Sequence, residues 1–301
     1  MIEELPSNTR KRAFYTLIFL LLFSIFSVRH FLIPFLSGDK ITLDIEVLNK
    51  ILDDVFTSTL VTIGLGIFIL WLTPKNKSNA QFRVLQPIEI SPTLENARTD
   101  TSKWSYSGGS GRYTRAITLP NLADLARRKN RTIDISIQIM NPHNITVCTN
   151  YAEYRNSLRS SKNRKTLKTV QLDLISTIVS AFVWKTEQSL LKIKLGLKDG
   201  FSLFRLDISS SNVVITKEDP IEPAMSHEQG TFFYQAYSED LLQSFNQCRI
   251  IDMSIRFYRK DEITVENTKR LLEQLGLMEL LTDADIPDII SNVISTKNPY
   301  A

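Results

Sequence analysis

The pattern with most binding chemistry is a glycine-rich loop, Gly-Gly-Ser-Gly at residues 108–111, followed by Arg112, Tyr113 and Arg115. Consecutive backbone N–H groups and two guanidinium groups can together hold an anion. The loop is neither the GxGxxG fingerprint nor a P-loop, since no Gly-Lys-Ser/Thr follows it. Arg112 and Arg115 are therefore ligand-binding candidates, and a simple turn with solvated arginines is the alternative.

A second candidate follows the clearest strand pattern of the chain, residues 132–140, in which isoleucines alternate. Residues 141–144 then read Asn-Pro-His-Asn. Proteins with α/β folds often bind ligands in the loops that follow their strands, which makes Asn141 a binding candidate. The loop holds no obvious nucleophile, and a turn that caps the next helix explains it equally well.

A third candidate is the pair Arg205 and Asp207, two residues apart in the predicted strand at 202–208. Residues two apart in a strand point to the same face of the sheet. The two charges therefore form either a surface pair or a polar pair that points into a cleft.

Basic residues gather in two groups, which could be solvated faces, contacts to anionic lipid headgroups, or contacts to nucleic-acid phosphates. The first group is Arg127, Arg128, Lys129 and Arg131, and the second is Arg155, Arg159, Lys162, Arg164, Lys165 and Lys168.

The elements that must position these residues alternate between strands and helices beyond residue 80. The spacing of apolar residues predicts strands at 83–90, 104–106, 132–140, 190–197, 202–208 and 213–216, and helices at 119–129, 151–158, 166–186, 231–247, 265–281 and 286–295. This order indicates an α/β domain with a mixed sheet.

Two uncharged apolar runs precede that domain, at residues 13–28 and 55–73, and the first resumes at 31–36. Each is long enough, by itself or with its extension, to cross a hydrocarbon core of about 30 Å. We therefore expect two N-terminal transmembrane α-helices followed by an α/β cytosolic domain with a mixed sheet. The alternative for the first run is a signal peptide, but no small-residue cleavage site follows it.

Basic residues flank both runs, at residues 10–12 and at Lys75, Lys77 and Arg83. The positive-inside rule then predicts a multi-pass membrane protein with both termini cytoplasmic. Arg29 and His30 interrupt the first apolar region, and ionisable groups at membrane depth are costly. They either lie at the outer interface or face the partner helices of a homo-oligomer.

Composition predicts neither a cofactor nor a metal site. The chain has 301 residues, a formal net charge of +4 and two cysteines, Cys148 and Cys248, which form no CxxC or Cys/His cluster. Free thiols are the expectation. We expect an anchor at 1–75, an α/β domain at 80–260 and a helical segment at 261–301.

The order of motifs resembles a degenerate phospholipase D-like domain. Its first half includes the glycine-rich loop, Asn141-Pro142 and Cys148, and its second half includes Phe-Arg-Leu-Asp-Ile at 204–208. That family uses duplicated His-x-Lys motifs, whereas none of the three histidines here is followed two residues later by lysine. The resemblance thus implies the fold without covalent-histidine chemistry, and with Arg205 and Asp207 where such a fold keeps charged residues.

The predicted architecture is also similar to that of the two-transmembrane effectors encoded beside retron reverse transcriptases in bacterial antiphage systems. This resemblance implies a toxin that a reverse transcriptase and its RNA–DNA hybrid restrain. Release on infection would perturb the bilayer of the inner membrane and abort phage replication.

Three hypotheses follow. The first is a non-enzymatic membrane effector whose cytosolic domain senses, or is restrained by, a partner. The second is a membrane-tethered enzyme that acts on phosphodiesters or nucleotides, with a site around Arg112, Asn141 and Arg205. The third is an assembly protein without toxic output.

Overall fold

The computed structural model describes residues 43–72, 82–161, 163–295 and 297, with a few isolated positions before residue 43. The chain divides into two compact units, residues 1–77 and 78–301. The described element of the first unit is helix α3 (Leu43–Leu72). The second unit holds a mixed sheet and all the other helices of the described residues.

The expectation of two N-terminal transmembrane helices is wrong. In the part of the chain that the structure describes, one helix is long and apolar enough to span a membrane, and it is α7 (Leu167–Glu187), in the middle of the chain. The predicted span at 55–73 falls in α3, which begins at Leu43 and so includes a charged first part. Most of the first run, with Arg29 and His30, lies outside the described residues.

The apolar surface of α7 packs inside the second unit. About two thirds of its most apolar stretch is buried (67%) inside the second unit. Leu174, Ile178 and Phe182 pack in the main core of that unit. A local run of apolar residues cannot distinguish a helix buried in protein from one buried in lipid, since both environments favour the same side chains.

The sheet has eight strands in the order β1-β7-β6-β5-β2-β3-β4-β8. Strands β2, β3 and β4 run parallel, and every other pairing is antiparallel, which confirms the predicted mixed sheet. The strands are β1 (Arg83–Leu85), β2 (Lys103–Ser107), β3 (Ile133–Met140), β4 (Leu191–Lys198), β5 (Phe204–Ser209), β6 (Asn212–Lys217), β7 (Ala224–Glu228) and β8 (Arg249–Ile250).

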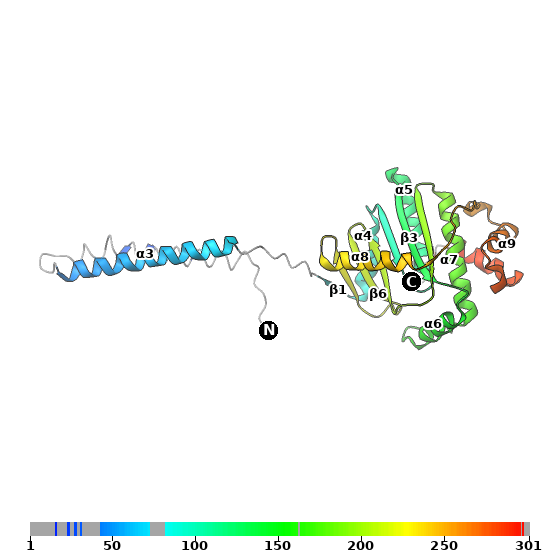
Figure 1. Ribbon diagram of the computed structural model, residues 1–301, viewed down its shortest axis with the longest axis horizontal. Coiled ribbons are helices and arrows are strands. Elements are labelled where there is room, and N and C mark those ends of the chain that lie inside the picture. The colour runs from blue at the N-terminus through cyan, green and yellow to red at the C-terminus, as the bar shows by residue number, and fades with distance from the viewer. Residues whose placement is uncertain are drawn as a thin grey trace. The chain divides into compact units, whose positions relative to one another are not determined.

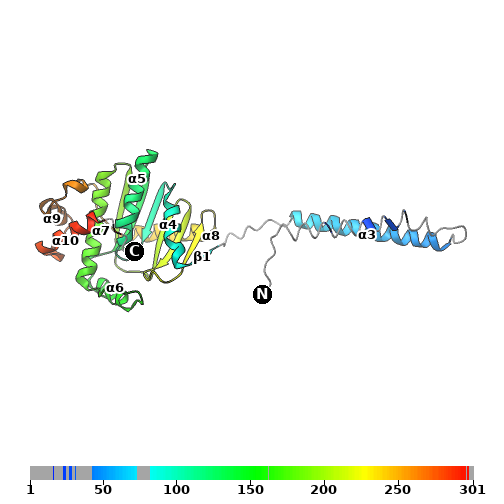
Figure 2. The same cartoon turned by 180° about the vertical axis from the view of Figure 1, so that it is seen from behind.

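Helices cover both faces of this sheet. Helix α8 (Phe232–Asn246) crosses one face, whereas α4 (Pro87–Arg98), α5 (Leu119–Lys129) and α7 lie against the other (Figures 1 and 2). Helix α5 connects β2 to β3, and α6 (Ile145–Ser157) with α7 connects β3 to β4, as parallel neighbours require.

The last part of the chain packs into the same core. Helix α10 (Ile286–Ile294) lies against α7 and α9 (Val265–Gln274) against α10. Leu272 and Ile289, both at 0% exposure, belong to the main core cluster. The segment expected at 261–301 thus completes the hydrophobic face of α7.

Helix α4 is the main difference from the predicted elements, because residues 83–90 were expected to form one strand. Strand β1 ends at Leu85, and α4 begins at Pro87, the first-turn position where proline is well tolerated. The N–H of Gln86 donates to Glu89 Oε2 at 2.8 Å, which closes the first turn. This helix forms one wall of the site described below.

Candidate functional site

The centre of the site is set by the register of three strands. Arg205 of β5 lies opposite Thr216 of β6, and Asp207 lies opposite Tyr106 of β2. Cross-strand partners project to the same face of a sheet, so these four side chains lie together. Thr216, at 3% exposure, is buried, as are Arg205 and Asp207.

Arg205 and Asp207 form a buried ion pair in which Arg205 Nε donates to Asp207 Oδ2 at 3.1 Å. The surface-pair alternative is therefore wrong, and the arginine of this pair lines a cavity. Burial raises the pKa of Asp207 above its ordinary range, and the charges of Arg205 and Arg98 oppose that rise. Arg205 thus pairs with this buried carboxylate directly, and Arg98 acts on it through its charge.

Tyr113 organises these cations. The guanidinium carbon of Arg205 lies 5.6 Å from the centre of the Tyr113 ring, and so does that of Arg98. Arg98 Nη2 also donates to the Tyr113 hydroxyl at 3.4 Å. Cation–π contacts and the Asp207 carboxylate together hold Arg205 in one orientation before any ligand arrives.

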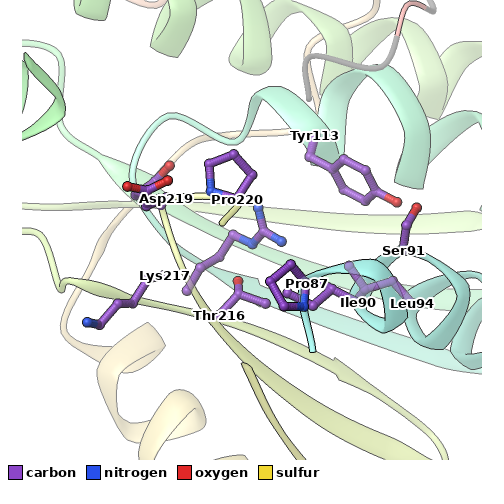
Figure 3. A pocket seen from close by; sticks show the side chains of 11 residues that line it. Pro87, Ile90, Ser91, Leu94, Tyr113, Thr216, Lys217, Asp219 and Pro220 are labelled. Carbon is purple, nitrogen blue, oxygen red and sulfur yellow. The ribbon is translucent and has the colours of Figure 1, made fainter. Parts of the chain in front are cut away.

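The cavity between these side chains and α4 has a volume of about 190 Å³. Figure 3 shows Tyr113 and Ser91 at one end and Asp219 and Pro220 at the other. Apolar side chains of α4 form one wall, and β5, β6 and the segment after β6 supply the polar residues. The lining residues are Pro87, Ile90, Ser91, Leu94, Tyr113, Arg205, Thr216, Lys217, Glu218, Asp219 and Pro220.

The two acidic residues of the lining are already engaged by neighbours. Glu218 is held by Arg155 of α6. Burial raises the pKa of Asp219, but hydrogen bonds from Ser160 and from the backbone N–H groups of Ile221, Ser160 and Arg159 outweigh it and leave the pKa below its ordinary value. Three guanidinium groups, from Arg98, Arg155 and Arg205, therefore surround the carboxylates of Asp207 and Glu218.

One polar atom of the lining has no protein partner. The hydroxyl Oγ1 of Thr216 is buried and makes no hydrogen bond with the described residues. Figure 3 shows this hydroxyl directed toward the interior of the cavity. Burial of an unsatisfied hydroxyl costs free energy, and such groups often mark the place of a bound molecule.

The glycine-rich loop contributes to the site through one residue of the predicted motif. Tyr113 faces the cavity, whereas Arg112 and Arg115 turn toward Asp173 of α7, at 3.7 Å and 3.6 Å. Desolvation lowers the pKa of buried Arg115, against the effect of Asp173. The two arginines thus hold the loop against α7. A π-helix, η2 (Thr114–Thr118), follows the loop and includes Arg115.

Asn141 and His143 belong to a turn away from the cavity. Asn141 Nδ2 donates to Asp199 Oδ1 at 2.9 Å, and Asn141 Oδ1 accepts from the backbone N–H of His143 at 3.1 Å. His143 Nδ1 lies 3.1 Å from Glu279 near the C-terminus. Asn144 caps α6, because its side chain accepts from the backbone N–H of Val147 at 3.1 Å, so the turn is a capping turn.

About half of the described residues in the two basic groups form ion pairs. Arg127 contacts Asp124 and Arg131 contacts Asp100, each at 3.1 Å, while Arg128 is exposed. In the second group, Lys165 contacts Asp173 at 3.0 Å and Lys168 contacts Asp285 at 2.7 Å. Lys162 lies outside the described residues.

Sequence reasoning missed Arg98, Thr216, Glu218 and Asp219, which carry no motif. One signal could have located Arg98. Pro87 and Glu89 are typical of a first helical turn, and a helix that begins there has Arg98 in its last turn. The described residues contain no cluster of His, Cys, Asp and Glu that could hold a metal ion. Burial raises the pKa of the Cys148 thiol to about 11, so it is not a nucleophile at neutral pH.

The chain thus contains an α/β domain with a mixed sheet and a cavity that has one apolar wall and a polar side with Arg205. No family model matches the chain, and no curated protein matches it. Several solved structures are similar to it in part, two of which are described here. One is Nuc from Salmonella typhimurium, a phospholipase D family member, with a TM-score of 0.34, 14% identity and coverage of 57% of this chain and 97% of that chain.

The other is TrmBL2, an archaeal chromatin protein whose structure is described as showing a novel mode of DNA binding. Its TM-score is 0.32 at 9% identity, with coverage of 68% of this chain and 67% of that chain. Both TM-scores are too low to support a conclusion about the function of this chain.

Proposed function

We propose that residues 82–297 form a non-catalytic binding module for a small phosphorylated ligand of the nucleotide class. The observation that carries this proposal is a cavity that presents a preoriented buried arginine, Arg205, beside the unsatisfied hydroxyl of Thr216. Arginine suits phosphate because its planar fork donates two parallel hydrogen bonds.

The rest of the lining fits the rest of such a ligand. Tyr113 offers an aromatic face, and Pro87, Ile90 and Leu94 offer an apolar wall on which a base can lie. The lining carries two basic residues, Arg205 and Lys217, and both acidic residues, Glu218 and Asp219, are engaged by neighbours. Arg205 is therefore the group of the lining that suits a ligand bringing negative charge.

A binding role is favoured over catalysis by the chemistry of the lining. The residues that form the cavity include hydroxyl groups but neither histidine nor cysteine. His143 contacts Glu279, and His227 lies among the rings of Phe82, Phe233 and Tyr237. A hydroxyl nucleophile in the cavity thus lacks the histidine base that usually activates it.

The test is AMP binding to the purified full-length chain by titration calorimetry. Thr216→Val should reduce the affinity about tenfold or more, because a hydrogen bond to a charged group contributes about 1.5–3 kcal/mol. The variant should not lose stability, because the Thr216 hydroxyl has no partner to lose. Ser91→Trp, at the rim, should block binding by filling the cavity.

Thr268→Val is the matched control, because Thr268 in α9 is also a buried threonine with an unpartnered hydroxyl. It should bind AMP as the natural chain does. Equal affinities of the natural chain and all three variants for AMP would contradict the proposal. Hydrolysis of bis(p-nitrophenyl) phosphate that Thr216→Val abolishes would establish the phosphodiesterase alternative instead.

The wider setting that we propose is an antiphage effector whose binding module is restrained by a reverse transcriptase and its RNA–DNA hybrid. The division of the chain into two units supports it, because control by a ligand or partner and the toxic output can then reside in separate parts. Cells carrying the chain with its neighbouring genes should resist phage, and Thr216→Val should weaken that resistance. Action at the inner membrane stays a prediction.

A further inference from the structure

The loop between α6 and α7, residues 158–166, borders the cavity. It begins just after Arg155 of α6, which pairs with Glu218, a lining residue next to Asp219. The end of the cavity that Glu218 and Asp219 line therefore lies beside the start of this loop.

Both ends of the loop are pinned, which defines its path. Before it, Arg155 of α6 contacts Glu218, which also lines the cavity. After it, Lys165 Nζ lies 3.0 Å from Asp173 of α7. Asn156 closes the loop, because its side chain donates to the Lys165 carbonyl at 2.8 Å and accepts from the Lys165 N–H at 2.6 Å.

These contacts sort the basic residues of the segment into two kinds. Arg155, Lys165 and Lys168 form ion pairs with acidic residues of this domain. Arg159 and Arg164 are exposed, and neither takes part in an ion pair of the described residues. The loop therefore presents two arginines to solvent, on the segment that follows Arg155 and its lining partner Glu218.

We infer that Arg159 and Arg164 bind phosphate groups that continue beyond the nucleotide held in the cavity. This inference rests on the proposed function and narrows the ligand to a nucleotide that carries further phosphates. Those phosphates belong to a nucleoside polyphosphate or to the backbone of a single-stranded oligonucleotide, and both present the same oxygens to a guanidinium group.

The test compares three probes by calorimetry in 50 mM NaCl on the full-length chain: AMP, ATP and a 5′-phosphorylated tetradeoxyadenylate. ATP, the oligonucleotide or both should bind at least tenfold more tightly than AMP. Raising the salt to 200 mM should reduce that gain, because the additional contacts are exposed and electrostatic.

The double variant Arg159→Gln/Arg164→Gln should lose most of the gain and keep the affinity for AMP. Arg127→Gln/Arg128→Gln is the matched control, because these exposed arginines lie at the end of α5 and not in the cavity lining. It should keep both the AMP affinity and the gain.

Each outcome has a separate meaning. A gain for ATP alone supports the inference with a polyphosphate ligand, and a gain for the oligonucleotide supports it with a nucleic-acid strand. AMP binding without any gain, or a gain that survives the double variant, overturns this inference and leaves the proposed function standing. A chain that binds none of the probes overturns both.

Discussion

At the scale of single residues, the domain tolerates several buried charges because nearly all of them have partners. Asp207 faces Arg205 and Arg98, and Glu218 faces Arg155. Removing one member of such a pair leaves the other buried and uncompensated, which costs more than the pair itself contributes. For that reason Thr216, which has no partner, is a better probe of the cavity than Arg205.

Lys198, at the end of β4, provides a pH-dependent prediction. Burial lowers its pKa, and the electrostatic effects of Cys248 and Glu218 only partly oppose this. The unfolded state therefore holds the proton more tightly between the lowered value and the ordinary value of about 10.4. The free energy of unfolding should accordingly rise with pH through that window.

Lys198→Met removes this linkage. The variant should be more stable than the natural chain at pH 7, and the difference should shrink as the pH rises toward 10. Urea unfolding between pH 7 and pH 10 measures it. Lys192→Met, on the exposed side of the same strand, is the control and should show a smaller difference. A stability difference for Lys198→Met that grows with pH would contradict the assigned cause.

At the scale of elements, helix ends decide where the loops of the site begin. Helix α5 ends at Asn130, whose backbone is left-handed with φ of 45°. Its N–H donates to the Arg127 carbonyl at 3.4 Å, and the next N–H, of Arg131, returns to Ala126. This ending turns the chain directly into β3, the central strand of the parallel group.

Asn130→Ala should therefore destabilise the domain by about 1 kcal/mol. Alanine keeps the Cβ atom, which costs roughly 1–2 kcal/mol in the left-handed region, but loses the short polar side chain with which asparagine offsets part of that cost. Asn130→Gly loses the same side chain without that strain, so it should be at least as stable as the natural protein. Thermal unfolding of both variants measures the effect. Equal losses in the two would show that the asparagine side chain matters more than the backbone.

At the scale of the whole molecule, the C-terminal helices are part of the core. Leu272→Ala in α9 should cost about 2–5 kcal/mol, because it removes a fully buried leucine and leaves a cavity. Val265→Ala, in the same helix at 46% exposure, should change stability by about 0.5 kcal/mol or less. If both substitutions had small effects, residues 261–301 would be a separate appendage, as the sequence division implied.

Much of the secondary structure was predictable from the sequence. The helices expected at 119–129, 166–186 and 286–295 match α5, α7 and α10 to within a residue at each end. The strand at 132–140 matches β3 equally well. Strong apolar periodicity in long elements survives in the fold, whereas β7 and β8 were missed because short strands carry too few residues to show a period.

The candidate site was predictable only in part. Arg205 and Asp207 could be paired from their spacing on one strand, and Tyr113 stood in a motif already of interest. The partners could not be found, because Arg98, Thr216 and Glu218 reach the cavity from three separate segments. Arg112 and Arg115 were predicted to bind a ligand because they are close to Tyr113 in the sequence. Their side chains turn instead toward Asp173, a direction that sequence position did not determine.

By itself, the sequence determined the local periods of the long elements, such as α5, α7, α10 and β3, and that the sheet is mixed. Only the tertiary structure decided that the apolar helix at Leu167–Glu187 lies in a protein core, and that α4 closes a cavity over Arg205 and Thr216. The physical reason is that hydropathy and spacing are properties of neighbouring residues. The surroundings of a side chain depend instead on strand register and on crossovers between distant segments.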